Sequence, residues 1–393
     1  MGVLKVLPPP LAEVVPPKLF TVSGAVKAQE CVLAGVLASD SSISGAERLA
    51  PVPKARLGTV LHRLVEDSAK GKIQGTGDVG ANVSHHFDVL LKDAEVELSQ
   101  SEYATMVPLR ASVGEITFRN RVRDAKQRAL EVLNRSLPRP PHAASSAPTS
   151  GGLPRNASEL WLESGELRLR GRTDLLSIDG SRVLIEDFKT GDVDVEDASP
   201  QLVLYALLAV AQRPGSSVEI AVLGGTRKKL SAEDLAAARA SLKSKTDQAS
   251  SGAATLAEHL ASPGSMCRHC DFRHRCRAYQ TWAVSTWANP SAERKEPLDT
   301  WGVVLRIERP HVQWVTIRIR DDAGREVDLV KIDASLSGVQ QLSVGARFYA
   351  FGVAAAASSR DAGGLLVHPR AFRELGNGDM QRAWPSFFVG TGA

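Results

Sequence analysis

Residues 171–205 read GRTDLLSIDGSRVLIEDFKTGDVDVEDASPQLVLY, and this stretch decides the fold. It contains two apolar, β-prone runs that meet at Asp179-Gly180, a dipeptide typical of a tight hairpin turn. We therefore expect two antiparallel strands. Their pairing would bring Asp174, near the end of the first run, beside Asp187, at the end of the second.

Three charged side chains gather at this predicted hairpin. Because side chains alternate between the two faces of a strand, Asp187 and Lys189 share one face, and Phe188 points to the other, toward the core. The close carboxylates of Asp174 and Asp187 repel each other, and a divalent cation relieves that repulsion. Two carboxylates and a lysine suit metal-assisted hydrolysis of a phosphodiester, with the lysine steadying the attacking water or the developing negative charge. The alternative is a solvated hairpin with surface charges.

A helix is predicted over residues 198–212, directly after the hairpin. It is apolar nearly all round, which is typical of a buried helix packed on a sheet. Gln201 and Tyr205 are four residues apart and therefore lie on one face of it. A buried Gln needs a polar partner, and a site at the sheet edge would supply one. The alternative is a Gln and a Tyr whose hydrogen bonds are satisfied within the core.

A second predicted helix, over residues 53–69, carries His62. Its apolar residues recur at helical spacing, and they are Leu57, Val60, Leu61, Leu64 and Val65. His62 lies beside this stripe, and Glu66 lies one turn further on. A lone histidine on a helix is more often a core or surface residue than a metal ligand, so its context decides.

Four short motifs supply that context, and they occur in order along the chain. They are Gly58-x-x-x-His62, Gly171-x-x-Asp174, Asp187-x-Lys189-Thr190-Gly191 and Gln201-x-x-x-Tyr205. With these motifs the chain resembles the RecB-type branch of the PD-(D/E)XK nuclease superfamily over about residues 20–281. The resemblance implies an α/β, restriction-endonuclease-like fold, in which helices flank a mixed sheet.

The resemblance also implies a metal-binding group and a catalytic group. The residues that would bind Mg²⁺ or Mn²⁺ are His62, Asp174, Asp187 and, through its backbone carbonyl, Phe188. The residues that would carry the catalysis are Asp174, Asp187, Lys189, Gln201 and Tyr205. Lys189 would assist the nucleophile, and Gln201 and Tyr205 would orient the site and the nucleic acid.

The chain has four cysteines, which are Cys31, Cys267, Cys270 and Cys276. One far upstream and three in a C-x2-C-x5-C cluster resemble the iron–sulfur subset of this family, which includes CRISPR-associated RecB-like exonucleases. In that subset four cysteines hold a [4Fe–4S] cluster that joins the two ends of the nuclease domain. Zinc also accepts four cysteines and is the alternative. Either would close the loop of 236 positions between Cys31 and Cys267 and contribute to folding.

Basic residues surround the three downstream cysteines, and they are Arg268, His269, Arg273, His274, Arg275 and Arg277. We expect the arginines among them to contact DNA, because basic side chains offset phosphate charge. The alternative is compensation of a negatively charged cluster. The net charge of the whole chain is only +4, so this local distribution matters more than the total.

Composition and the N-terminal sequence set the expected compartment. An apolar content of 43% supports well-formed cores, and four cysteines in 393 residues argue against a disulfide scaffold. No apolar run approaches the length of a membrane span, and prolines break the N-terminal segment where a signal peptide would need an apolar region. We expect a cytoplasmic protein with no membrane contact.

We expect two folded domains. The predicted segments are an extended tail (1–22), the nuclease domain (23–281) with a flexible loop (137–157), a linker (282–297), a β domain (298–375) and a C-terminal tail (376–393). Within the nuclease domain, Ser23 to Leu37 is predicted to be one helix carrying Cys31. Cys31 is followed by Val32-Leu33-Ala34, whereas family members often carry Cys-Pro-Arg and aromatic residues there.

The β domain contains five short runs that alternate or stay apolar, with one short helix expected at 334–341, between the third and fourth. Five strands with a helix after the third resemble an OB-like small β-barrel. Such barrels often bind single strands through stacked aromatic residues. The candidates are Trp301, Trp314, Phe348 and Tyr349. A docking or stabilising module is the alternative.

These features together predict a Mg²⁺- or Mn²⁺-dependent deoxyribonuclease with a structural [4Fe–4S] cluster, acting on single-stranded DNA or DNA ends in repair or phage defence. The chain has no G-x-x-x-x-G-K-[ST] motif, so a helicase or a defence-system protein would be a separate partner. The alternative is a non-catalytic DNA-binding or scaffold subunit that retains the nuclease fold, and an RNA-processing nuclease is a third hypothesis.

Overall fold

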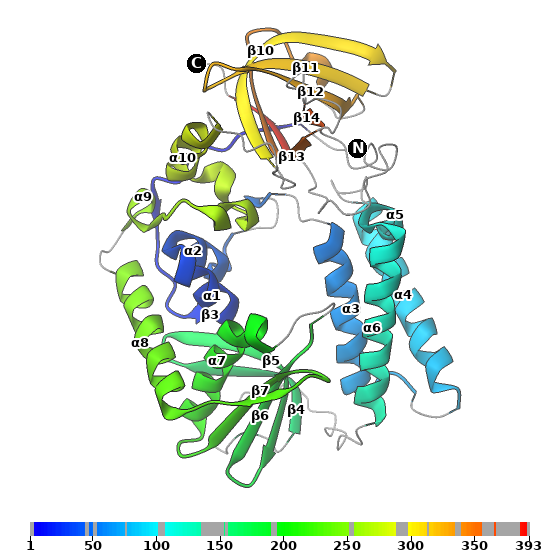
Figure 1. The fold of residues 1–393 in the computed structure, drawn as a ribbon, viewed down its shortest axis with the longest axis vertical. Coiled ribbons are helices and arrows are strands. Elements are labelled where there is room, and N and C mark those ends of the chain that lie inside the picture. Colours follow the sequence, from blue (N-terminus) through cyan, green and yellow to red (C-terminus); the bar gives the residue numbers. More distant parts are fainter. Residues whose placement is uncertain are drawn as a thin grey trace.

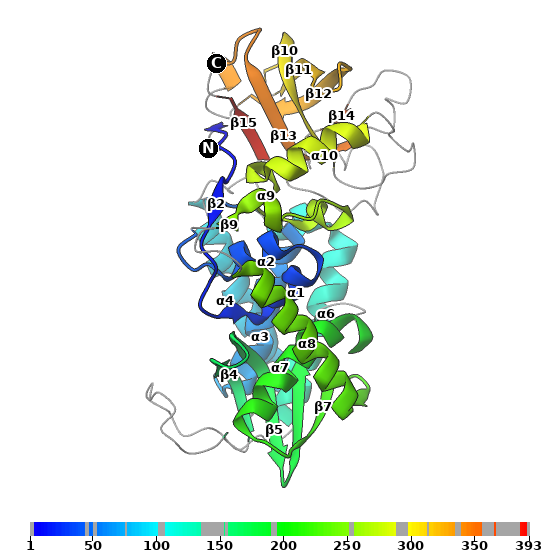
Figure 2. The ribbon, with the colours of Figure 1, turned by 90° about the vertical axis from the view of Figure 1, so that its left-hand side faces the viewer.

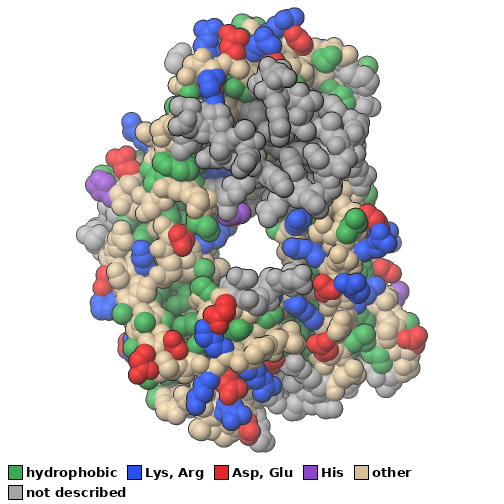
Figure 3. Space-filling model, viewed as in Figure 1, with side chains coloured by type: hydrophobic (Ala, Val, Ile, Leu, Met, Phe, Trp, Pro, Cys, Tyr) green, Lys and Arg blue, Asp and Glu red, His purple; other side chains and the backbone are tan. Residues whose placement is uncertain are grey.

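The computed structural model describes residues 4–43, 47–49, 53–74, 77–100, 107–134, 153, 156–189, 195–250, 255–287, 298–312, 314–334, 339–355, 365–366 and 386–390. Figure 1 shows a sheet with its helices at the lower end, a helical arm beside it, and a β module at the upper end. The space-filling view shows an opening in this arrangement, and Lys and Arg side chains lie on its border over the helical arm (Figure 3).

A mixed six-stranded sheet forms the base of the molecule. Its order is β3-β5-β6-β7-β8, and β4 also pairs with β5. The strands are β3 (Phe20–Thr21), β4 (Asn156–Ser164), β5 (Leu169–Asp179), β6 (Arg182–Asp187), β7 (Ser217–Val222) and β8 (Arg227–Lys229). The predicted hairpin is confirmed, because β5 and β6 are antiparallel and join at Gly180, whose φ of 57° suits a glycine. Strand β6 then runs parallel to β7.

Four of the described helices pack against the six-stranded sheet. They are α1 (Val22–Glu30), α2 (Val32–Ser39), α7 (Val195–Gln212) and α8 (Ala232–Ala249), and their apolar faces share one core with the sheet. Helix α8 begins with a capping box between Ser231 and Asp234. The prediction of a single helix over 23–37 is wrong. The backbone of Cys31 is extended, with φ −148° and ψ 111°, and this residue separates α1 from α2.

The helical arm consists of α3 (Pro53–Ala69), α4 (Val79–Ser99), α5 (Leu109–Val113) and α6 (Glu115–Asn134). The predicted apolar stripe of α3 is buried against α4 and α6, with Leu57, Leu61 and Leu64 fully enclosed. The other end of α3 docks on the sheet, because Val65 packs in a small cluster with Leu175 and Phe188. This contact fixes the position of α3 relative to the ends of β5 and β6.

The C-terminal β module is one sheet of seven strands. They are β10 (Leu298–His311), β11 (Trp314–Asp321), β12 (Glu326–Asp333), β13 (Arg347–Ala355), β14 (Leu365–Leu366), β15 (Ser386–Val389) and β1 (Lys5–Val6), in the order β1-β15-β13-β10-β11-β12-β14. Strand β14 pairs with β12 in parallel and with β13 antiparallel. A 3-10 helix, η5 (Val339–Gln341), lies between β12 and β13.

Both ends of the chain contribute to these sheets. The segment expected to be an extended N-terminal tail supplies β1, β2 (Glu13–Val14) and β3, and β2 pairs with β9 (Thr255–Leu256). The expected C-terminal tail supplies β15. The termini therefore meet on the β module, where β1 pairs with β15 (Figure 2).

The segment with the three downstream cysteines connects the nuclease core to the β module. It contains α9 (Ala257–Leu260), the 3-10 helices η3 (Ser265–His269) and η4 (Arg273–Arg275), and α10 (Arg277–Trp287). Helix α10 continues into the expected linker, and 288–297 lies outside the described residues. Most of the expected flexible loop 137–157 also lies outside them. In the described part of the chain, no helix combines the length and the apolar content that crossing a membrane would require.

Candidate active site

The ends of β5 and β6 bring the predicted carboxylates together. In the register of the hairpin Leu175 is opposite Glu186, so the next pair is Asp174 and Asp187. Asp187 is buried, and its Oδ2 lies 2.9 Å from the Lys189 Nζ. Asp187 and Lys189 thus lie on one face of the strand end, as the alternation of side chains predicts.

Asp174 is held by two groups from different elements. One carboxylate oxygen lies 3.0 Å from the His62 Nε2 on α3, and the other accepts a 2.6 Å hydrogen bond from the Phe188 backbone N–H. The Phe188 side chain is buried, and its ring lies 5.7 Å from the His62 ring, centre to centre. The docking of α3 on the sheet therefore places His62 at the strand ends, although more than a hundred residues separate it from Asp174.

The two carboxyls have opposite pKa shifts. Burial, and then the nearby charge of Asp174, raise the pKa of Asp187 to about 6. Burial would also raise the pKa of Asp174, but the hydrogen bond and charge of His62 outweigh it and lower that pKa. Asp174 in turn raises the pKa of His62 against the opposing effect of burial. Asp174 and His62 therefore behave as an ion pair, and Asp187 is the carboxyl that retains a proton more readily.

Gln201 on α7 connects the lysine to the carboxylate. Its Oε1 accepts a 3.0 Å hydrogen bond from the Lys189 Nζ, and its Nε2 donates a 3.4 Å hydrogen bond to the Asp187 Oδ1. This side chain has the polar partners that its place on an apolar helix requires. We call His62, Asp174, Asp187, Lys189 and Gln201 the acidic site.

Tyr205 lies one turn further along α7 and supports the backbone of β5. Its hydroxyl donates a 2.8 Å hydrogen bond to the carbonyl of Arg172, and its ring is buried. This packing explains the glycine in Gly171-x-x-Asp174. A Cβ at Gly171 would lie 2.6 Å from a Val22 methyl and 2.7 Å from the Tyr205 Cε1, too close for any other residue.

Glu159 belongs to this region, and it was not among the predicted residues. It lies on β4 opposite Asp174, since Ser158 pairs with Leu175 and Leu160 pairs with Thr173. One ligand atom each from His62, Glu159 and Asp174 lies within 4.8 Å of the others. The short turn 165–168 joins β4 to β5, with Ser164 paired to Leu169, and counting back along this hairpin places Glu159 opposite Asp174. The sequence therefore contained the signal, which is an acidic residue at this position of a β-prone run.

Comparison with known families identifies the fold that carries this site. The sequence model of the PD-(D/E)XK nuclease superfamily matches residues 20–277. The chain belongs to this superfamily. Its members are generally nucleases that use divalent metals such as Mg²⁺ or Mn²⁺, so the domain implies nucleic-acid binding and metal-dependent cleavage. No curated protein matches the chain by sequence.

The donor atoms of the acidic site suit a hard cation. Carboxylate oxygens are the preferred ligands of Mg²⁺, and imidazole nitrogen with carboxylate oxygen also suits Mn²⁺. The atoms that could hold such an ion come from His62, Glu159, Asp174 and Asp187. The two last residues of the Asp187-x-Lys189-Thr190-Gly191 motif lie outside the described residues.

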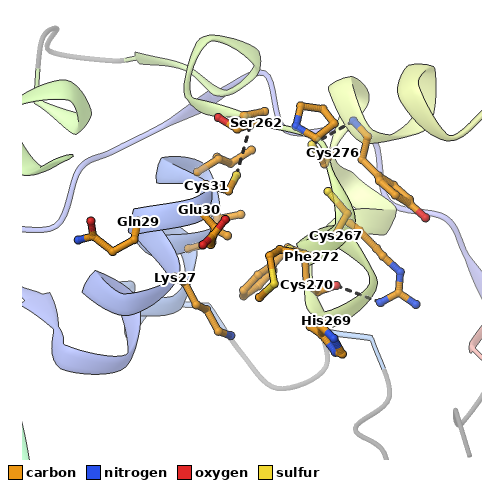
Figure 4. A pocket seen from close by; sticks show the side chains of 18 of the residues that line it. Lys27, Gln29, Glu30, Cys31, Ser262, Cys267, His269, Cys270, Phe272 and Cys276 are labelled. Carbon is orange, nitrogen blue, oxygen red and sulfur yellow. Dashed lines mark hydrogen bonds between the residues drawn. The ribbon is translucent and has the colours of Figure 1, made fainter. Parts of the chain in front are cut away.

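The four cysteines line a single cavity of about 310 Å³, which we call the cysteine cavity. Figure 4 shows Cys31 on one side of it and Cys267, Cys270 and Cys276 on the other. Backbone N–H groups of Ser262, Gly264 and Tyr279 each donate a 3.4 Å hydrogen bond to a sulfur, respectively that of Cys31, Cys267 and Cys276. The extended conformation of Cys31 between α1 and α2 turns it toward the other three.

Burial raises the pKa values of the three downstream thiols of this cavity. It raises the pKa of Cys270 to about 12 and that of Cys276 to about 11, and it also raises the pKa of Cys267. Without a bound metal these groups are neutral thiols at pH 7. A metal that binds them as thiolates must release their protons.

The expectation that arginines of this segment contact DNA is wrong for Arg273. This side chain is buried, and its Nε lies 2.6 Å from the Asp299 Oδ2 on β10. Arg275 is mostly buried as well, and its Nη1 lies 3.0 Å from the Glu47 Oε1. His274 is buried and stacks on Phe388 of β15, and its surroundings lower its pKa to about 3. Arg273 and His274 therefore join the cysteine segment to the β module, whereas Arg275 pairs with the segment before α3.

Two of the four candidate stacking aromatics are also part of the core. Trp301 and Phe348 are almost fully buried, so neither ring is available to a base. The Trp301 Nε1 donates a 3.0 Å hydrogen bond to the Asp322 Oδ2 within the β module.

Proposed function

We propose that the chain is a Mg²⁺- or Mn²⁺-dependent deoxyribonuclease that acts on single-stranded DNA or on DNA ends. The observation that carries the proposal is the acidic site, in which Asp187, Lys189 and Gln201 bond to one another beside Asp174. This cluster lies within a domain of a superfamily whose members are generally nucleases. Basic side chains beside the opening in Figure 3 would offset the charge of a phosphate backbone.

The proposed roles follow from the contacts. His62, Asp174 and Asp187 would hold the ion, with the Phe188 carbonyl as a further ligand; the bound ion would polarise the scissile phosphate and lower the pKa of a water. Lys189 carries its positive charge next to Asp187 and would orient the attacking water and neutralise developing charge.

The residues on α7 would act by positioning. Gln201 holds the Lys189 ammonium through its Oε1, which limits the directions in which that charge can point. Tyr205 is buried against the β5 backbone, so we assign it to fixing the strand that carries Asp174 rather than to contacting the nucleic acid.

We further propose a RecB-like assignment, with a [4Fe–4S] cluster in the cysteine cavity. The support is the lining of one cavity by Cys31, Cys267, Cys270 and Cys276, and zinc held by the same four cysteines is the alternative. The backbone N–H groups that point at three of the sulfurs would stabilise thiolate charge in a bound cluster. The cluster would join α1 and α2 to the segment before α10.

We also propose that the β module is an OB-like barrel, with 298–375 as its domain. The support is the pairing of β14 with both β12 and β13, together with η5 after the third strand. The buried Trp301 and Phe348 and the Arg273–Asp299 contact favour a docking role over single-strand binding. A nuclease domain over 23–281 and a separate helicase or defence-system partner remain part of the proposal.

The test is cleavage of end-labelled single- and double-stranded DNA, and of matched RNA, with Mg²⁺ or Mn²⁺. The anaerobically purified wild type would be compared with Asp187→Ala and with Asp179→Ala, an exposed aspartate on the same hairpin. We expect Asp187→Ala to lose at least about ten-thousandfold in rate, more than 5 kcal/mol, because a metal ligand is lost. Asp179→Ala should cut normally.

Two outcomes would change the proposal. A folded, cluster-loaded wild type that binds DNA under Mn²⁺ without cutting it would indicate a non-catalytic DNA-binding or scaffold subunit. Preferential cleavage of the RNA would indicate an RNA-processing nuclease.

A further inference from the structure

Glu159 lies directly across the sheet from Asp174, on the strand that precedes the hairpin. The pairs on either side, Ser158 with Leu175 and Leu160 with Thr173, fix this register. Two acidic residues at opposite positions of an antiparallel pair bring like charges together, which destabilises a sheet. A compensating positive charge is therefore required between β4 and β5.

The Glu159 carboxylate is buried and makes no hydrogen bond among the described residues. Its side chain is 5% exposed, and neither of its oxygens has a hydrogen-bond partner. An ion pair partly compensates the negative charge of Glu159, because the Arg172 Nε lies 2.5 Å from the Glu159 Oε2. The geometry of this contact does not make it a hydrogen bond. A buried carboxylate with unused lone pairs is costly unless another group binds it.

The backbone at Glu159 is also unusual. Its φ is +56°, a left-handed conformation that favours glycine and that a glutamate adopts at some cost. Burial, and then the charge of Glu66, raise the pKa of this carboxyl. The fold therefore accepts both backbone strain and electrostatic strain in order to hold this side chain beside His62 and Asp174.

We propose that Glu159 is a ligand of the divalent ion, and that it completes a three-sided site with His62 and Asp174. The ligand atoms of these three residues already lie within 4.8 Å of one another. In the absence of the ion Arg172 holds the Glu159 carboxylate in place as its counterion. This inference rests on the proposed function, because it concerns the same metal-dependent site.

The ion and Arg172 therefore compete for one carboxylate. The Arg172 side chain is 47% exposed, so it can turn toward solvent when the ion binds. This competition gives the two partners of the Glu159–Arg172 ion pair opposite effects on metal affinity.

The test is Mn²⁺ binding to the full-length, cluster-loaded protein, measured by titration calorimetry without DNA. We expect Glu159→Gln to weaken binding by at least about tenfold, the loss that even an outer partner of a metal ligand typically causes. Arg172→Gln should tighten binding a few-fold, since a half-exposed charge is partly screened by solvent. Glu163→Gln, on the same strand but exposed, is the matched control and should bind as the wild type does.

The proposal requires that Glu159→Gln weakens Mn²⁺ binding and that Arg172→Gln tightens it. A purely structural ion pair would give two variants with lowered stability and the same or jointly weakened Mn²⁺ binding, and that result would overturn it. If Glu159→Gln fails to fold, Arg172→Gln alone decides, because unchanged or weaker binding is then contrary to the proposal. A wild type that neither binds Mn²⁺ nor cuts DNA would instead count against the proposed function.

Discussion

The carboxylates of the acidic site and the thiols of the cysteine cavity are held in different ways. Asp187 lies against the ammonium of Lys189, and Asp174 lies against the imidazole of His62. The sulfurs of Cys31 and Cys267 accept hydrogen bonds from backbone N–H groups, and burial raises the pKa values of Cys267, Cys270 and Cys276. The protein therefore arranges the acidic site with its own charges, whereas the thiols become charged only when a metal replaces their protons.

This difference suggests that the acidic site serves catalysis and that the cysteine cavity serves folding. A site that is already organised can lose and regain an ion without unfolding, as a catalytic ion requires. A site whose charge depends on its metal couples binding to folding. Two results would contradict this difference. One is an acidic-site substitution that unfolds the protein, and the other is a cysteine substitution that leaves its stability unchanged.

The largest expected effect on stability comes from Cys31→Ser. If the cysteine cavity holds the proposed cluster, the substitution removes the link between positions 31 and 267, which encloses 236 positions and in a chain-entropy treatment contributes on the order of 5 kcal/mol. We expect loss of the visible absorbance of the cluster and a much lower Tm, measured by calorimetry. Ser265→Ala, an exposed position in the same 3-10 helix as Cys267, is the control and should change neither the absorbance nor the Tm. An unchanged Tm for Cys31→Ser would show that the cysteine cavity is not structural.

The second prediction concerns the contact between the cysteine segment and the β module, which depends on Asp299. Asp299 accepts hydrogen bonds from the Arg273 guanidinium, from the Tyr279 hydroxyl and, at 2.7 Å, from the Gly352 backbone N–H. Asp299→Ala would leave the buried Arg273 without its counterion, so we expect a loss of about 3–5 kcal/mol in the free energy of unfolding. Glu326→Ala, which removes an exposed pair with Arg320, is the control and should change little. Equal losses in the two variants would contradict a special role for Asp299.

A third prediction concerns the packing that prepares the acidic site. Gly171→Ala would push a methyl group into Val22 and Tyr205, and we expect a loss of about 1–3 kcal/mol in stability. Displacement of β5 would also misplace Asp174 and lower the cleavage rate up to about a hundredfold. Gly58→Ala is the matched control, because open space surrounds the position and alanine favours a helix by up to about 1 kcal/mol. Thermal denaturation and cleavage assays on both variants check this, and a neutral Gly171→Ala would be contrary to it.

The sequence predicted the parts of the site that depend on short-range rules. The Asp179-Gly180 turn fixes the hairpin, and the register of the hairpin places Asp187 opposite Asp174. Glu159 was missed, although the short turn 165–168 joins β4 to β5 and this hairpin sets Glu159 opposite Asp174. The arginines near the cysteines were misjudged for a different reason: a run of basic residues usually lies on the surface, and the docking of β10, which no short-range rule reveals, buries Arg273.

The smallest predicted effect is the pH dependence of Mn²⁺ binding. The pKa of Asp187 is raised from 3.8 to about 6, so below pH 6 an incoming ion must displace a proton from this carboxyl. Relative to Asp187→Asn, the affinity of the wild type should then fall by up to about tenfold for each pH unit below 6, because His62, whose pKa is also raised, titrates in both proteins. Calorimetric titration of the wild type and of Asp187→Asn, which has no such proton, measures the slope directly.

The same proton sets the sign of a stability change in the metal-free protein. Between pH 3.8 and about 6 the folded state holds a proton that the unfolded chain has lost. The contribution of Asp187 to stability is therefore fully present below pH 3.8 and is lost as the pH rises through about 6. The free energy of unfolding of the wild type should decline across this window relative to that of Asp187→Asn. A parallel profile for the two proteins would mean that Lys189 and His62 already compensate both carboxylates, and that the acidic site is as fully organised before the ion binds as it is afterwards.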